Sequence, residues 1–120
     1  MKKLALIAIA VLLAPAAASA ADLSGAWKLV VMVADMTVPI SCTFADASGA
    51  LTGTCNRTDQ AESPSALTGT LDGAKAKWAY DVKFQDMPLH IEYAGDLSSD
   101  TAMTGTISVA GQSGTFTASK

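Results

Sequence analysis

The sequence predicts an all-β protein: an eight-stranded antiparallel up-and-down barrel that follows a cleaved signal peptide. Three observations predict this fold class. Apolar and polar residues alternate with a period of two in one stretch after another, short turn sequences separate the stretches, and no helical period follows residue 20. An open meander would leave two unpaired edges, and closure into a barrel removes them. A two-sheet sandwich is the alternative architecture.

The first 20 residues have the three parts of an export signal. Lys2 and Lys3 form the positive start, residues 4–13 are apolar, and Ala18-Ser19-Ala20 is a small-residue cleavage site. We expect cleavage after Ala20 and a single domain over residues 21–120. The exported protein would be periplasmic or secreted.

The mature chain is acidic. The formal net charge of the whole chain is −3, and removal of Lys2 and Lys3 makes it more negative by two. Such a surface repels nucleic-acid phosphates and anionic headgroups. No later apolar run approaches the roughly 20 residues of a membrane helix, and the outward strand positions are polar, unlike those of a membrane barrel. We expect neither nucleic-acid binding nor membrane insertion.

The first three strands are predicted at residues 26–34, 37–46 and 51–57. In the first, Trp27 and every second residue up to Val33 are apolar. The loop at 47–50 sets a register that places Cys42 directly opposite Cys55 on one face, with Phe44 opposite Gly53. Facing cysteines in an oxidising compartment predict a disulfide. A metal site and a reactive thiol are the alternatives. A metal site needs more ligands nearby, and the one histidine stands alone.

The next three strands are predicted at residues 66–71, 75–84 and 87–97. Asp72-Gly73 is a strong hairpin signal, and a turn there places Leu67 against Trp78. The turn Gln85-Asp86 joins the second and third of these strands. Its register pairs inward residues only: Phe84 with Met87, Val82 with Leu89, Tyr80 with Ile91 and Trp78 with Tyr93.

The last hairpin is predicted at residues 102–109 and 114–118, with Ile107 opposite Phe116. An apolar-Thr-Gly-Thr pattern recurs at residues 51–54, 67–70 and 103–106, and its glycine points inward each time. Glycine weakens a strand, so its repeated use predicts sharp bending where a small barrel curves. A hollow left for a ligand is the alternative explanation.

Groups that could catalyse a reaction are not gathered at one place. No Asp, Glu or His is expected on the inward face, and His90 points outward beside Glu92. The loop serines have no histidine in register to activate them. No phosphate-binding glycine loop, metal-ligand spacing or dinucleotide fingerprint occurs. We therefore expect no catalytic residues, no cofactor and no metal, and a protein that is not an enzyme.

Ser24-Gly25-Ala26-Trp27 resembles the Gly-x-Trp opening of calycin barrels, which include lipocalins, fatty-acid-binding proteins, avidins and bacterial metalloprotease inhibitors. Residues 48–54, 65–70, 77–78 and 114–116 are similar, in the same order, to the strand signatures of the avidin and streptavidin group. This resemblance implies the barrel fold. It does not carry the biotin site, because the polar ligands of that group are replaced here by Leu29, Val31, Val33, Cys55, Arg57 and Gly114.

The expected function is that of an exported, non-enzymatic barrel that binds a small apolar ligand inside. The candidate ligand-binding residues are Trp27, Trp78, Tyr80, Tyr93 and Phe116, although the same aromatics could simply fill a dry core. The alternative is a protein-interaction module, such as a periplasmic protease inhibitor. The resemblance to the inhibitors implies action through a protruding segment at residues 21–24, and the polar connection at 56–65 is a second contact candidate. A third reading is an envelope accessory protein without a defined ligand.

Overall fold

The computed structural model of the chain describes residues 22–61 and 63–120, so the predicted signal peptide lies outside the described residues. Eight strands fill most of this part of the chain: β1 (Gly25–Val33), β2 (Met36–Ala47), β3 (Ala50–Arg57), β4 (Ser65–Asp72), β5 (Lys75–Phe84), β6 (Met87–Ser99), β7 (Ala102–Val109) and β8 (Gln112–Ser119). Each predicted strand is present, with bounds that differ by at most a few residues. No helix suited to crossing a membrane occurs among the described residues.

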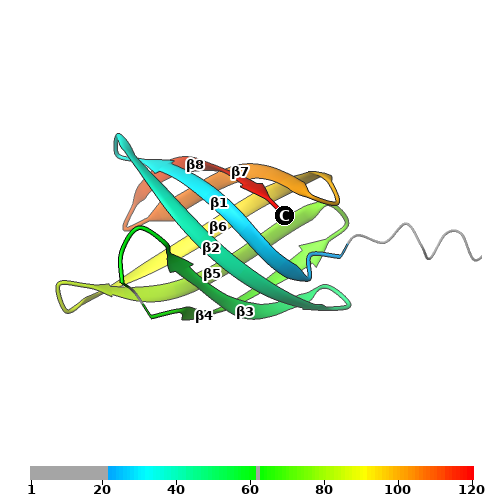
Figure 1. Ribbon diagram of the computed structural model, residues 1–120, viewed down its shortest axis with the longest axis horizontal. Helices are drawn as coiled ribbons and strands as arrows, with labels where there is room; N and C mark the ends of the chain where they lie inside the picture. The colour runs from blue at the N-terminus through cyan, green and yellow to red at the C-terminus, as the bar shows by residue number, and fades with distance from the viewer. Residues whose placement is uncertain (1–21, 62) are drawn as a thin grey trace, which may run out of the picture.

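The strands form one closed antiparallel barrel in sequence order, as Figure 1 shows. Closure comes from the pairing of β1 with β8, which places Val31 opposite Phe116. The prediction of a closed all-β barrel is therefore confirmed, and the sandwich alternative is wrong. Because every strand has two neighbours, the sheet has no free edge among the described residues.

Two of the predicted registers are confirmed residue by residue. Between β5 and β6, Trp78 lies opposite Tyr93 and Tyr80 lies opposite Ile91, around a turn in which Gln85 and Asp86 both have positive φ. Between β2 and β3, Cys42 lies opposite Cys55, with 4.1 Å between their Cα atoms, and the two form the predicted disulfide.

Two other predicted registers are wrong by two residues. Trp78 lies opposite Gly69 rather than Leu67, because the β4–β5 turn is Gly73-Ala74 and not Asp72-Gly73. Phe116 lies opposite Gly105 rather than Ile107, because β7 and β8 run on to a tight turn after Val109. A shift of two residues keeps every side chain on its predicted face. In both cases the aromatic residue lies opposite a glycine.

The glycines of the Thr-Gly-Thr repeats stand where neighbouring backbone comes very close. A Cβ at Gly53 would collide with the carbonyl oxygen of Thr43, and one at Gly69 would collide with that of Lys77. Gly105 is equally crowded by Ala94. These glycines therefore leave no hollow, and their close contacts support the bending interpretation.

The two ends of the barrel differ. We call one end the N-terminal end. It carries residues 22–24, the turns at 48–49, 73–74 and 100–101, and the last residues of the chain. We call the other end the loop end. It carries the turns at 34–35, 85–86 and 110–111 and the longer connection at 58–64. Figure 1 shows the β1–β2 and β5–β6 hairpins projecting at the loop end. These hairpins come from opposite sides of the barrel, since two strands separate them in either direction around the closed order.

Candidate functional site

The N-terminal end is closed by Leu23. This side chain is 0% exposed and belongs to the hydrophobic core. Its amide donates to Asp46 Oδ2 at 3.1 Å, and its carbonyl oxygen accepts from Trp27 Nε1 at 2.9 Å. The Ser24 hydroxyl accepts a further hydrogen bond from the Asp46 amide. The expectation that residues 21–24 protrude is therefore wrong for residues 22–24, because burial of Leu23 holds them against the barrel; residue 21 lies outside the described residues.

Four of the five predicted ligand-binding residues lie together in the barrel interior. Trp78 and Tyr93 stack with their ring centroids 4.7 Å apart, and Phe116 meets both rings edge-on. Tyr80 stacks on Tyr93 at 5.7 Å. Trp27 is buried at the N-terminal end, where it holds Leu23, and it belongs to the closure of that end.

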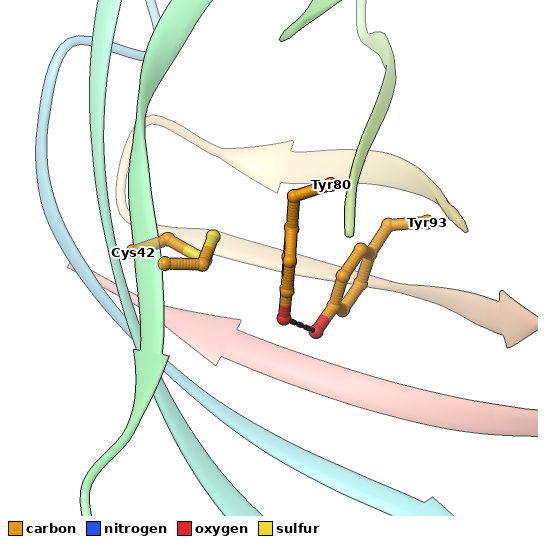
Figure 2. The surroundings of a disulfide bond; sticks show 4 residues. Cys42, Tyr80 and Tyr93 are labelled. Carbon is orange, nitrogen blue, oxygen red and sulfur yellow. Dashed lines mark hydrogen bonds between the residues drawn. A yellow bond between two sulfur atoms is a disulfide. The ribbon is translucent and has the colours of Figure 1, made fainter. Parts of the chain in front are cut away.

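The hydroxyl groups of Tyr80 and Tyr93 point toward each other in the surroundings of the disulfide (Figure 2), with their oxygens 2.6 Å apart. Both side chains are buried, as are Cys42 and Cys55. The pair is thus a polar element inside an apolar barrel, and each hydroxyl can both donate and accept.

One buried hydrogen-bond donor lacks a partner. Among the described residues, Trp78 Nε1 is the one buried side-chain nitrogen or oxygen that makes no hydrogen bond. The Trp78 side chain is 2% exposed, and its ring makes an edge-on contact with Phe44. A buried donor left unpaired costs roughly 1–3 kcal/mol, so an acceptor placed beside it would be stabilised.

Toward the loop end the apolar side chains of the inward face become accessible to solvent. Inward side chains near the N-terminal end, such as Phe44 and Met103, are 3% and 1% exposed, whereas Met36 and Met87 at the hairpin ends are 52% and 66% exposed. The alternation of each strand places a further set of partly exposed apolar residues on this same face. We call the whole set the apolar rim: Val33, Met36, Val82, Met87, Leu89, Ile91 and Val109.

The expectation for Met87 needs a correction. It occupies an inward position opposite Phe84, as predicted, but its side chain is not buried. The β5–β6 hairpin extends past the rest of the barrel (Figure 1), and Met87 is the first residue of β6 after its turn, so it remains exposed. The same holds for Met36 in the β1–β2 hairpin.

Within the described strands, two charged side chains lie at inward positions, and one of them, Asp46, is contrary to the expectation that no acidic group faces inward. Asp46 is at the N-terminal end, where it accepts from the amides of Leu23 and Gly49 and so has a structural role. Arg57 is at the loop end, opposite Ile40 in the register. Its Nε and Nη2 atoms each donate to one oxygen of Asp59 at 2.9 Å, and this contact lowers the pKa of Asp59.

The outer surface carries the remaining polar groups. His90 faces outward and is paired through Nδ1 with Asp81 at 2.7 Å, which raises the pKa of His90. An outer groove of about 540 Å³ crosses β4–β8, lined by outward residues such as Thr68, Lys77 and Thr106. Within residues 22–61 and 63–120, no group of three or more His, Cys, Asp or Glu side chains is placed to hold a metal ion.

Comparison with known proteins supports the fold but assigns no family or function. No protein-family model matches the chain, and no curated protein matches it in sequence. A redesigned β-barrel of known structure is 17% identical, with a TM-score of 0.61, over 82% of this chain and 90% of that one. A second redesigned β-barrel, mFAP1, whose structure is bound to DFHBI, is 15% identical with a TM-score of 0.54, over 82% of this chain and 94% of that one. At these identities the likeness is one of fold, and neither an avidin nor a calycin assignment follows from it.

Proposed function

We propose that this protein is an exported, non-enzymatic barrel that binds a small apolar ligand at the loop end of its interior. The observation that carries the proposal is the apolar rim. Its members occupy inward positions of β1, β2, β5, β6 and β7 at one end of the barrel. Partly exposed apolar side chains that gather at one such opening, rather than scattered over a surface, are typical of ligand or partner sites. At the N-terminal end the equivalent face is closed by Leu23.

The ligand would enter between the two projecting hairpins and reach toward the Tyr80–Tyr93 pair. Methionine is flexible, so Met36 and Met87 can adapt to the shape of the molecule between them. The tyrosine hydroxyls and Trp78 Nε1 supply polar groups that would orient it. The structurally similar barrel mFAP1, which is bound to DFHBI, supports the proposal only in that a barrel of similar fold accommodates a small molecule.

The proposal of export rests on the signal at residues 1–20 and agrees with the Cys42–Cys55 disulfide, which is typical of oxidising compartments. The proposal that the protein is not an enzyme rests on the character of the interior. Among the described residues, the buried side chains with nitrogen or oxygen atoms are tyrosines and tryptophans. Their hydroxyl and indole N–H groups hold ligands more readily than they transfer protons near neutral pH.

Titration with N-phenyl-1-naphthylamine, a neutral apolar probe that becomes fluorescent in apolar surroundings, tests the proposal. We expect saturable binding by the mature protein. Leu89→Glu places a charge on the half-buried rim and should weaken binding at least tenfold. Thr106→Glu places the same charge in the outer groove and should change binding less than twofold. Circular dichroism would verify that both variants are folded.

Absence of saturable binding by the folded wild-type protein would contradict the proposal. The reverse pattern would contradict it as well. If Thr106→Glu abolished binding while Leu89→Glu did not, the ligand would lie in the outer groove and not in the barrel.

A further inference from the structure

We propose that the ligand is an amphiphilic anion, whose carboxylate or sulfonate group pairs with Arg57 while its apolar part lies within the apolar rim. This inference rests on the proposed function, because it names the chemical class of the ligand bound at the same site. The observation behind it is the position of one cation.

Arg57 is the one Lys or Arg at an inward position of the described strands. It follows buried Cys55 by two residues on β3 and lies opposite Ile40, so its backbone is part of the barrel wall at the loop end. Its side chain is 24% exposed. Arg57, Ile91 and Val109 all lie in the halves of their strands that are nearer the loop end, so a ligand with its apolar part in the rim would have its polar end in the same opening as the guanidinium.

Asp59 shows the geometry that such a headgroup would adopt. Its two carboxylate oxygens accept from Arg57 Nε and Nη2, both at 2.9 Å, in the paired arrangement that guanidinium favours with carboxylates. Asp59 belongs to the 58–64 connection and not to a strand, and its side chain is 40% exposed. An arriving anion can therefore take the place of Asp59 without breaking any strand pairing, and Asp59 would return to water.

Because the ligand's anionic group only replaces the carboxylate of Asp59, we expect the site to prefer a charged ligand over a neutral one only moderately. The headgroup gains two charge-assisted hydrogen bonds, and the protein loses an equivalent pair that is partly screened by solvent. The difference between a charged and a neutral ligand should then be about fivefold to tenfold in affinity, and it should decrease as salt is added.

Two probes with the same anilinonaphthalene skeleton test the inference. N-phenyl-1-naphthylamine is neutral, and 8-anilino-1-naphthalenesulfonate carries one negative charge. Arg57→Gln should weaken sulfonate binding at least fivefold while changing neutral-probe binding less than twofold. Asp59→Asn removes a carboxylate that competes for Arg57 and should strengthen sulfonate binding about threefold. Lys83→Gln, which removes an outward-facing charge at the same end, should change neither probe more than twofold.

The opposite effects of the first two variants separate headgroup recognition from a structural ion pair. If the Arg57–Asp59 contact only supported the loop, both variants would weaken both probes, and the inference would be wrong. Unchanged sulfonate affinity in Arg57→Gln would also overturn it, while leaving the proposed apolar site intact. Failure of the wild-type protein to bind either probe would overturn the proposed function together with the inference.

Discussion

Replacement of Leu23 by alanine tests whether the N-terminal residues close the barrel. Leu23 is 0% exposed, and it is held by backbone hydrogen bonds to Asp46 and Trp27 that an alanine would keep. The loss is therefore that of the side chain alone. Buried leucine-to-alanine changes cost about 2–5 kcal/mol, and a site at a barrel end can relax in part, so we expect about 3 kcal/mol.

Thermal and urea unfolding of the mature protein, followed by circular dichroism, would measure this loss. For a domain of about 100 residues, 3 kcal/mol corresponds to a decrease in Tm of about 12–20 °C. Val30→Ala provides the control, since Val30 is an apolar strand residue that is 46% exposed, and it should cost less than about 0.5 kcal/mol. A loss below about 1 kcal/mol for Leu23→Ala would refute the conclusion that Leu23 closes the barrel. It would again favour the expectation that residues 21–24 protrude, as in a protease inhibitor.

Three further predictions concern other parts of the barrel. Replacing Cys42 and Cys55 together by alanine should lower the free energy of unfolding by about 2–4 kcal/mol, because the disulfide restricts the unfolded chain; equal urea midpoints for variant and wild type would contradict this. Gly69→Val should cost at least about 2 kcal/mol, because its side chain would collide with neighbouring backbone, and a variant of wild-type Tm would revive the hollow as the explanation. The pKa of His90 is raised by Asp81, so their contact stabilises the folded state fully below pH 6.5 and is lost as the pH rises through the folded-state pKa. Comparison of Tm at pH 5.5 and 8.5 in wild type and His90→Gln should show a smaller pH-dependent decrease in the variant; identical decreases would contradict the assignment.

The faces of the strands could be predicted from the sequence more securely than their registers. Alternation alone places Trp78 and Tyr93 inward, and a two-residue shift leaves that unchanged. The register depends on which pair of residues forms each turn. Two turns, Asp72-Gly73 and Gly73-Ala74, are compatible with a positive φ at Gly73, and the structure has the second. The second turn places Gly69 opposite Trp78, where a Cβ would collide with Trp78. Such a contact between strands cannot be predicted from a local sequence pattern.

The candidate site was predicted less completely. The aromatic residues of the interior were identified, but Trp27 belongs to the closed end. Leu23 was not expected in the core, because it precedes the first alternating stretch. The apolar rim and Arg57 were missed for a different reason: the alternation reaches Met36 and Arg57, but exposure at a strand end depends on how far each hairpin projects beyond the barrel. That length follows from strand tilt and stagger, which belong to the closed sheet as a whole.

Residue-by-residue NMR shift mapping is the most direct test of the account, which holds that a ligand binds inside the barrel at the loop end. The isotope-labelled mature protein would be titrated with N-phenyl-1-naphthylamine. The account predicts that the largest shifts occur at the methyl groups of Val33, Leu89 and Val109, with smaller shifts at Leu23 and in the outer groove. Shifts centred on Thr68 and Thr106, or no shifts at saturating probe, would contradict it.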